Sequence, residues 1–583
     1  MKALRFAVFG FLILAVSYLS RADVQGDYTY TVAEGKATIT DFNTMYSGPL
    51  SITNELGGYP VVDIANFSFS SCYGLTSVTI PASVTNIGES VFESCRAMAS
   101  IAIGTNVGAI GYGTFYDCTN LMSITIPDSV IRLGEDMFDS CSALTNVTIG
   151  AGVTNIGAAV FLYCTSLAGI TIPPSVRSIG DYAFEGCSSL RRLDLPSSVT
   201  TIGNYAFYYL ENLTNVTMAA GLTSIGSSAF EGCPNLSEVT CGTGLASIGY
   251  RAFRYCTGLK SILIPSNTTY VGQSAFAGCT GMTNATIGGG TLDTQAFSEC
   301  SNLTGVVFGP NVSSIGNKVF FGCVRLARVT IPDNVQSLGS ETFWSCTAMT
   351  DVTIGSSVTS VGYRAFCECS NLVSVTLGSN VVSMGYQTFF SCTSLTNITL
   401  SPKLTDIPAI AFAYCVNLAQ ITIPDSVTII RDFAFQKCSN LISVTVGTGV
   451  VEVAYNVFDG ASRLQSVYFT GSLPTVGLYV FDYSSPTIYY LPDYASTWGS
   501  TFGGRPTKLW NPAFINVNCS GGLISCTVTG TPAIPVGLEM RTNLLSGPWV
   551  CVECTNLPPA GSYAFQDPGG SNCPVRFYRV IGP

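Results

Sequence analysis

Phenylalanine recurs through most of this 583-residue chain at a fixed spacing of 23 residues, interrupted by a single step of 21. A fixed period of this length indicates stacked coils, in which each repeat contacts only its neighbours. The sequence therefore predicts a solenoid and not a globular catalytic domain. The nineteen positions are Phe69, Phe92, Phe115, Phe138, Phe161, Phe184, Phe207, Phe230, Phe253, Phe276, Phe297, Phe320, Phe343, Phe366, Phe389, Phe412, Phe435, Phe458 and Phe481.

The composition argues against several functional classes. The chain has no histidine, which is the most common general acid or base and the usual nitrogen ligand of zinc. Charged residues make up only 10% of the chain and the net charge is −10, so a basic surface for nucleic acid or anionic lipid is not expected. The sequence has no phosphate-binding loop, calcium loop or paired-carboxylate motif. We therefore expect no enzymatic activity, no cofactor and no metal site.

One coil is clearest over residues 121–141. Ile124 lies in a strand, and Pro127 ends that strand because proline has no N–H to donate to a ladder. Gly134 is expected to permit a bend before Phe138 fills the interior. Each coil contributes about five apolar side chains that one coil alone could not bury, which is why many coils are needed.

These residues resemble the 23-residue bacterial surface leucine-rich repeat of the BspA or Treponema type. The pattern Leu-x-x-Val-x-Ile-Pro-x-x-Val-x-x-Ile-Gly-x-x-Ala-Phe-x-x-Cys is matched over Leu167–Cys187, and the resemblance covers roughly residues 60–483. It implies a mainly β, curved leucine-rich-repeat solenoid with a parallel sheet on its concave face and short helical or irregular arms. It also implies a secreted or surface-displayed protein that binds other proteins, as several adhesins do. Two residues are missing between Ile287 and Phe297, so the outer arm of that coil is expected to be shortened.

The rest of the chain divides into a leader, two caps and a further domain. Lys2 and Arg5 precede a run of 14 apolar residues, and Ser20-Arg21-Ala22 is typical of a cleavage site. The apolar run is too short to span a membrane, which takes about 20 residues. This pattern predicts export to the cell surface or the medium, with no membrane span. The predicted segments are a signal peptide (1–22), a strand-rich N-terminal cap (23–60), a solenoid of about 19 coils (61–483), a C-terminal cap (484–510) and a small β-sandwich (511–583).

The last segment has short apolar runs separated by glycine and proline turns, which favours a β-sandwich. Its runs at 541–549 and 576–579 resemble the immunoglobulin-like module that ends many secreted proteins of environmental bacteria. It contains an odd set of cysteines, so one or two disulfides with at least one cysteine left over are expected. These cysteines are Cys519, Cys526, Cys551, Cys554 and Cys573.

Sixteen cysteines follow a repeat phenylalanine by three residues. A stack of thiols suggests either a metal or redox chain, or a column of small buried hydrophobic side chains. Leu210 and Ala461 occupy the same position in two coils, which favours the second interpretation. Disulfides along the column are disfavoured, since Cβ atoms about 4.8 Å apart exceed the mean of about 3.8 Å in a disulfide. We expect reduced, buried thiols at Cys72, Cys95, Cys118, Cys141, Cys164, Cys187, Cys233, Cys256, Cys279, Cys300, Cys323, Cys346, Cys369, Cys392, Cys415 and Cys438.

Thirteen of eighteen strands carry threonine at an outward-facing position. Threonine suits strands because it is β-branched, so the row can be explained without any function. Alternatively, a regular row of hydroxyls could match ice or crystalline polysaccharide. It could also form the background of a protein-binding face. We expect specificity where charged or aromatic residues interrupt the row, and these are the candidate binding residues. They are Arg192, Asp194, Glu238, Arg328, Asp351 and Tyr468. The sequence predicts an adhesin-like protein with an extracellular protein partner; a structural envelope or matrix component, or a glycan-binding module, is the alternative.

Overall fold

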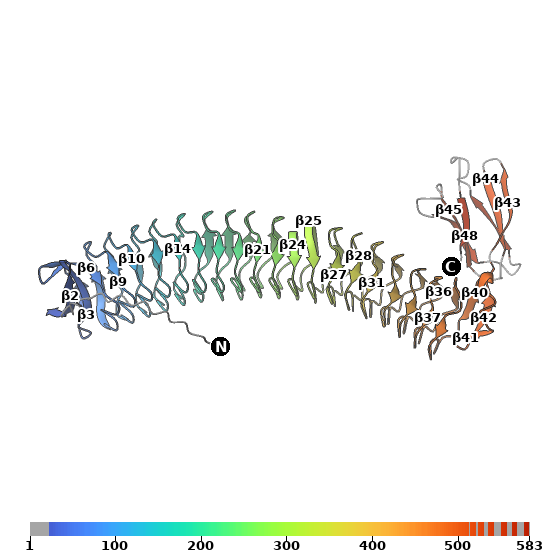
Figure 1. Cartoon of the computed structure of the whole chain (residues 1–583), viewed down its shortest axis with the longest axis horizontal. Coiled ribbons are helices and arrows are strands. Elements are labelled where there is room, and N and C mark those ends of the chain that lie inside the picture. Colours follow the sequence, from blue (N-terminus) through green and yellow to red (C-terminus); the bar gives the residue numbers. More distant parts are fainter. Residues whose placement is uncertain are drawn as a thin grey trace, which may run out of the picture. The chain divides into compact units, whose positions relative to one another are not determined.

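The computed structural model describes residues 22–511 and, beyond them, six strands between residues 513 and 581 (Figure 1). The chain divides into two compact units, residues 1–190 and 191–583. In each unit, strands of successive coils pair in parallel, and the helical content of the described residues is one short 3-10 turn, η1 (Pro492–Tyr494). The predicted fold class, a mainly β solenoid with a parallel sheet, is confirmed. The predicted signal peptide lies outside the described residues, except for Ala22.

An antiparallel ribbon closes the N-terminal end of the first unit. β2 (Tyr28–Ala33) and β3 (Lys36–Phe42) form a hairpin, and β3 then lies parallel to β6 (Tyr59–Ile64) in the first coil. The ring of Phe42 packs 4.7 Å from that of Phe69, the first phenylalanine of the column. The ribbon therefore covers an apolar coil end that would otherwise face water.

Most coils contribute one strand to a sheet face and a shorter strand to a second arm; the coil that begins at Leu167 contributes only the second. In the first unit, the sheet-face ladder is β4 (Ser47–Ser51), β7 (Gly74–Thr79), β9 (Ser100–Ala102), β11 (Ser123–Thr125) and β13 (Asn146–Thr148). Its second arm contains β8 (Asn86–Ile87), β10 (Ala109–Ile110), β12 (Arg132–Leu133), β14 (Asn155–Ile156) and β15 (Ser178–Ile179).

The second unit repeats this plan. Its sheet-face strands are β16 (Arg192–Leu195), β18 (Asn215–Met218), β20 (Glu238–Thr240), β22 (Ser261–Ile264), β26 (Arg328–Thr330), β28 (Asp351–Thr353), β30 (Ser374–Thr376), β32 (Asn397–Thr399), β34 (Gln420–Ile423), β36 (Ser443–Val446) and β38 (Ser466–Phe469). Its second arm contains β17 (Thr201–Ile202), β19 (Ser224–Ile225), β21 (Ser247–Ile248), β23 (Tyr270–Val271), β27 (Ser337–Leu338), β29 (Ser360–Val361), β31 (Ser383–Met384), β33 (Asp406–Ile407), β35 (Ile429–Ile430), β37 (Glu452–Val453) and β39 (Thr475–Val476).

The coil with two missing residues joins its two arms into one strand. β24 (Asn284–Leu292) and β25 (Gly305–Ile315) run from the sheet face into the second arm and pair with each other in parallel. The Pro-x-x turn of the other coils is replaced in β24 by Gly288, Gly289 and Gly290, and the chain stays extended. The shortening predicted for this coil thus takes the form of a lost turn.

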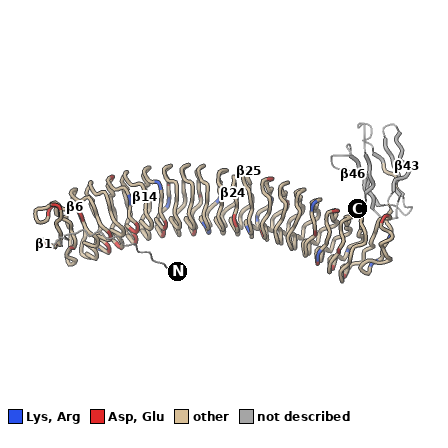
Figure 2. The backbone as a smooth tube through the Cα atoms, viewed as in Figure 1, with Lys and Arg blue, Asp and Glu red and all other residues tan. Residues whose placement is uncertain are grey.

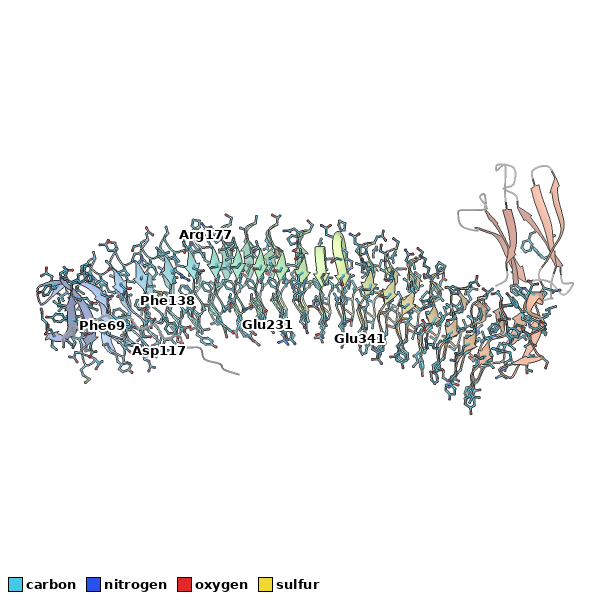
Figure 3. The ribbon with its side chains drawn as sticks, in the orientation of Figure 1. Phe69, Asp117, Phe138, Arg177, Glu231 and Glu341 are labelled. Carbon is cyan, nitrogen blue, oxygen red and sulfur yellow. The ribbon has the colours of Figure 1, made fainter. Side chains whose placement is uncertain are left out.

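The phenylalanine column forms the centre of the interior. The rings of Phe230, Phe253 and Phe276 are parallel within 3° and lie 5.1 and 5.2 Å apart. All three side chains are fully buried, as is that of Phe138 in the first unit, which is labelled in Figure 3. Offset stacking of this kind adds about 0.5–1.5 kcal/mol per pair to the energy of burial.

The glycine that lies four residues before most of the repeat phenylalanines has a different role from the predicted one. Gly134 and Gly249 do not have the left-handed backbone that only glycine tolerates well. Instead, a Cβ atom on Gly249 would lie 2.6 Å from the carbonyl carbon of Gly226, one coil earlier. These glycines therefore allow neighbouring coils to approach each other closely.

A third segment of each coil, which carries the phenylalanine, also has hydrogen bonds to the next coil. The N–H groups of Ser228, Phe230 and Gly232 donate to carbonyl oxygens of the next coil at 2.7, 2.7 and 2.9 Å. Ser228 and Gly232 are left-handed, with φ of 52° and 73°. Because left-handed and right-handed residues alternate here, the three N–H groups point toward the same neighbouring coil.

The C-terminal end of the sheet face is covered by β40 (Thr487–Tyr490), β42 (Arg505–Leu509) and aromatic side chains. Trp498 and Phe502 lie 5.1 and 5.2 Å from Phe469. Further strands, among them β1 (Asp23–Gln25), β5 (Glu55–Leu56) and β41 (Thr501–Phe502), are short edge elements.

The C-terminal residues form two three-stranded antiparallel sheets. Their orders are β43-β44-β47 and β46-β45-β48, with bounds Ala513–Ser520, Leu523–Thr529, Pro535–Arg541, Val550–Asn556, Ser562–Asp567 and Phe577–Ile581 for β43 to β48. The predicted sandwich also requires these sheets to pack together, which stays a prediction. Cys573 and the side chains of the other four cysteines of this segment lie outside the described residues.

Candidate functional site

The outward residues of the sheet face form two rows along the second unit. In the first row, Arg192, Asn215 and Glu238 are in register on β16, β18 and β20. In the second row, threonines such as Thr353, Thr376 and Thr399 are in register and exposed, as the alternation predicts. Charged residues are sparse along the coils (Figure 2), so the charges that do interrupt the rows stand out.

The candidate residues on β16 and β20 form one charged cluster. Arg192 Nε donates to Asp194 Oδ2 at 2.7 Å, with both side chains more than half exposed. This hydrogen bond lowers the pKa of Asp194 and raises that of Arg192. Asn215 Nδ2 donates to Glu238 Oε2 at 2.7 Å, which links the carboxylate to the neighbouring strand. We call these four residues the first charged cluster.

Arg328 and Asp351 form a second charged cluster. Arg328 Nε lies 3.4 Å from Asp351 Oδ2, and the arginine side chain is 80% exposed. The hydroxyls of Thr350 and Ser374 donate to the Asp351 carboxylate at 2.9 and 3.0 Å and lower its pKa. The aspartate is thus held in place, while the guanidinium remains available to a partner.

Two apolar residues that the sequence analysis did not select stand between these clusters. Leu263 on β22 and Val307 on β25 occupy threonine positions of the second row and are 61% and 63% exposed. Thr286 on β24 is in register with both. The signal was present in the sequence, because leucine and valine interrupt the row as clearly as a charge does. We call Leu263, Thr286 and Val307 the apolar patch.

Tyr468 does not belong to an exposed binding surface, so that prediction is wrong. Only 1% of its surface is exposed. Its ring stacks on Tyr489 at 4.9 Å and meets the edge of Trp510 at 5.5 Å. The side chain does face out from the sheet, but the C-terminal cap folds over it, and this burial raises its pKa to about 12.

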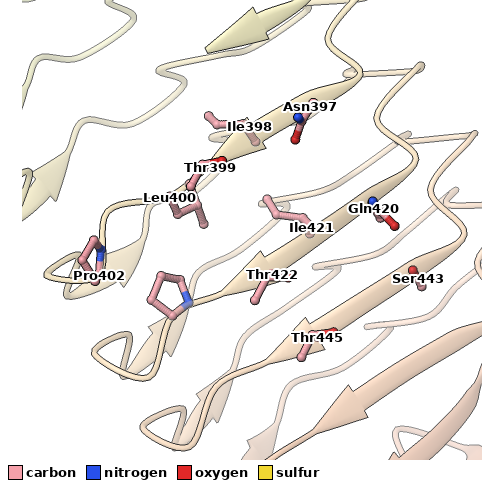
Figure 4. Close-up of a pocket in the computed structure, with 11 residues that line it drawn as sticks. Asn397, Ile398, Thr399, Leu400, Pro402, Gln420, Ile421, Thr422, Ser443 and Thr445 are labelled. Carbon is pink, nitrogen blue, oxygen red and sulfur yellow. The ribbon is translucent and has the colours of Figure 1, made fainter. Parts of the chain in front are cut away.

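A shallow pocket of about 390 Å³, with both polar and apolar lining, lies further along the same face (Figure 4). It spans β32, β34 and β36, and its floor includes the threonine row. Its lining has amides and hydroxyls but no charged group: Asn397, Ile398, Thr399, Leu400, Pro402, Gln420, Ile421, Thr422, Pro424, Ser443 and Thr445.

The cysteine column is enclosed by the coils. Each of the sixteen side chains is 0% exposed, and all are free thiols. From Cys95 onward, each thiol lies within hydrogen-bond distance of the carbonyl oxygen of the previous coil's phenylalanine, at 3.2 Å from Cys95 to Phe69. Burial raises the pKa of Cys72 to about 11 and that of Cys95 to about 12, so thiolates are disfavoured. Among the described residues, no group of three or more acidic or cysteine side chains could hold a metal ion.

Comparison with known proteins identifies the repeat. The family model of the BspA type leucine rich repeat region matches residues 62–191, 154–283, 288–387 and 363–488. No curated protein matches the chain. The described residues contain no helix with the length and apolar character needed to cross a membrane.

Several solved structures are similar to this chain. A leucine-rich repeat protein from Bacteroides ovatus is 23% identical over 84% of this chain and 99% of its own, with a TM-score of 0.41. A leucine rich cell surface protein from Faecalibacterium prausnitzii is 22% identical over 77% and 95%, with a TM-score of 0.25. The pneumococcal vaccine antigen PcpA is 14% identical over 84% and 98%, with a TM-score of 0.28. Because these TM-scores are below 0.5, the assignment rests on the family model, which spans most of the solenoid: the chain belongs to the BspA-type leucine-rich repeat family.

Proposed function

We propose that this protein is exported and binds an extracellular protein through the sheet face of its second unit, with the apolar patch at the centre. The observation that carries the proposal is the exposure of Leu263 and Val307, in register with Thr286, in an outward row that elsewhere in the second unit is threonine apart from Asp194 and the buried Tyr468. Protein interfaces typically combine an apolar centre with a polar, charged rim. Here the two charged clusters lie on either side of the patch along the strand order.

The electrostatics of the rim support binding by a partner of mixed charge. Arg192 and Asp194 neutralise each other, as do Arg328 and Asp351. The second cluster is therefore neutral overall, and the first has one net negative charge, that of Glu238, whose carboxylate is bonded to the uncharged amide of Asn215. Such exposed pairs add little to folding stability, with a median of about 0–1 kcal/mol. They are therefore available to exchange an internal ion pair for one with the partner, which contributes specificity more than affinity.

The family supports the same role. Leucine-rich repeat proteins of this type are surface proteins, and the similar structure from Faecalibacterium prausnitzii is named a cell surface protein. The predicted signal peptide agrees with export. We expect no catalysis by this chain.

A pull-down from extracellular proteins with residues 23–583 as bait, followed by affinity measurement on the recovered partner, tests the proposal. The variant Leu263→Thr/Val307→Thr restores the residue that the repeat uses at both positions. We expect it to weaken binding at least tenfold, or about 1.4 kcal/mol, with stability changed by less than about 0.5 kcal/mol.

Ile131→Thr/Val451→Thr is the matched control, since these residues are 59% and 58% exposed on the second arm, away from the sheet face. This control should bind as the wild type does. Equal binding by the wild type and the Leu263/Val307 variant would contradict the proposal.

The uncharged pocket on β32, β34 and β36 favours a second candidate function, binding of a neutral glycan. Its amides and hydroxyls match the hydroxyl groups of an uncharged sugar chain, and it lacks the cations that an acidic glycan would require. Gln420→Ala should reduce retention on a neutral polysaccharide column if this function exists. Unchanged retention would leave protein binding as the function of the face.

A further inference from the structure

The second unit ends in an edge that the C-terminal cap leaves partly open. The cap covers the sheet-face strand β38, whereas β39 is the last strand of its ladder among the described residues. Five apolar side chains along this edge are 40–81% exposed. They are Leu473, Val476, Leu478, Tyr479 and Tyr483, and we call this segment, residues 473–483, the terminal edge.

Every earlier coil satisfies its backbone groups through the next one. In the penultimate coil, the carbonyl oxygens of Val451 and Val453 accept from the N–H groups of Thr475 and Gly477 at 2.9 and 2.8 Å. These are the acceptors of the second arm. The parallel register of β37 with β39 also directs the N–H group of Val453 to the carbonyl oxygen of Thr475. A coil therefore offers two carbonyl acceptors and, between them, one N–H donor to its successor on this arm.

The phenylalanine segment of the same coil offers donors instead. The N–H groups of Asn456, Phe458 and Gly460 donate to the next coil at 3.1, 2.8 and 2.9 Å. The two acceptors and one donor of the second arm are thus followed, along the chain, by three donors.

In the last coil these groups have no successor. The corresponding acceptors are the carbonyl oxygens of Pro474 and Val476. The corresponding donors are the N–H group of Val476 on the arm and the N–H groups of Tyr479, Phe481 and Tyr483 after it. Within the described part of the chain, no residue donates to the first set or accepts from the second. An unpaired strand edge of this kind is a template for another chain.

The order of acceptors and donors makes the terminal edge complementary to itself when one copy is reversed. A two-fold axis beside Leu478 would bring the N–H group of Tyr479 in the first copy opposite the carbonyl group of Val476 in the second. By symmetry, the N–H group of Tyr479 in the second copy then faces the carbonyl group of Val476 in the first. The exposed side chains of Leu478 from both copies then meet. We propose that two copies of this chain pair tail to tail through the terminal edge.

This symmetry is the most common one among soluble oligomers, since a single surface serves both partners. The pairing is independent of the proposed binding function, but it would give each dimer two sheet faces. Two binding surfaces on one particle strengthen attachment to a surface that displays many copies of a ligand.

Sedimentation velocity over a concentration series of residues 23–583 tests the pairing. We expect a monomer–dimer equilibrium whose dissociation constant rises at least tenfold in Leu478→Lys. The side chain of Leu478 is 69% exposed, so the variant should fold normally, which circular dichroism checks. Ile131→Lys, at a residue that is 59% exposed on the second arm of the first unit, should leave the equilibrium unchanged.

Cross-linking gives a second readout that depends on the axis. Leu478→Cys should form more covalent dimer under mild oxidation than Ile131→Cys and the wild type, which carry the same leftover cysteine of residues 511–583, because Leu478 lies beside its own copy across the axis. A chain that stays monomeric throughout the series, or a dimer that is unaffected by Leu478→Lys and not cross-linked by Leu478→Cys, would overturn the proposal.

Discussion

The thiol of Cys118 donates a hydrogen bond of 3.1 Å to the carbonyl oxygen of Phe92, in the previous coil. The same pair of positions is linked in coil after coil, for example from Cys256 to Phe230 at 3.1 Å. The cysteine column therefore joins neighbouring coils through polar contacts inside the core. Leu210 and Ala461 show that a coil can form without this bond, so its contribution is one of stability.

Removal of one thiol should measure that contribution. We expect Cys256→Ala to lower the free energy of unfolding by about 1–2 kcal/mol, since it deletes a hydrogen bond worth about 0.5–1.5 kcal/mol and leaves a small cavity. Urea denaturation followed by circular dichroism gives the value. The exposed substitution Thr330→Ala is the control and should change it by less than about 0.5 kcal/mol. A neutral Cys256→Ala would show that the thiol acts as a small hydrophobic side chain only.

Thiol labelling tests the redox state of the column. Because the sixteen side chains are 0% exposed and free, they should resist alkylation in the native protein. They should react fully after unfolding in denaturant without reductant. Cysteines that stay unlabelled under these unfolding conditions would be in disulfides, contrary to this prediction.

The raised pKa values of the thiols predict a loss of stability in alkali. Cys72 and Cys95 titrate at about 11 and about 12 in the folded chain, against 9.0 for an ordinary thiol. Above pH 9 the unfolded chain loses these protons first, so the stability is fully present below pH 9 and is lost as the pH rises through 11 to 12. Urea midpoints should fall between pH 9 and 11. Cys95→Ala should show a smaller fall, and an equal fall in both proteins would assign the effect to other groups.

The close approach of coils predicts opposite effects at two glycines. Gly249→Ala would place a Cβ atom 2.6 Å from the backbone of Gly226, so we expect a destabilisation of about 1–3 kcal/mol from overpacking. Gly108→Ala is the control, because the nearest atom would be 3.9 Å away and the chain gains from reduced flexibility when unfolded. Thermal denaturation should separate the two variants. Similar melting temperatures would contradict the packing role of Gly249.

The repeating parts of this fold could be predicted from sequence because equivalent positions in successive coils have the same environment and therefore similar residues. Phe253 and its equivalents recur wherever the interior must be filled, so periodicity alone locates the core. The thirteen threonines alternate with inward residues, and alternation alone places them outside. Neither inference needs a contact between distant residues.

Features that depend on a neighbouring element could not be predicted in the same way. Tyr468 occupies an outward position, and its burial depends on Trp510, which is 42 residues later and packs over it. The role of Gly249 depends on the backbone of the previous coil and not on its own conformation. The apolar patch differs from both cases, because Leu263 and Val307 visibly interrupt the threonine row. The prediction considered only charged and aromatic interruptions of that row and therefore did not include them.

Hydroxyl-radical footprinting of the complex with the recovered partner tests the binding face most directly, since it reports which side chains lose contact with water. We expect oxidation of Leu263 and Val307 to fall strongly on binding, while oxidation of Ile131 and Val451 stays the same. Unchanged oxidation of Leu263 and Val307, with protection on the second arm or within residues 512–583 instead, would contradict the proposed binding face.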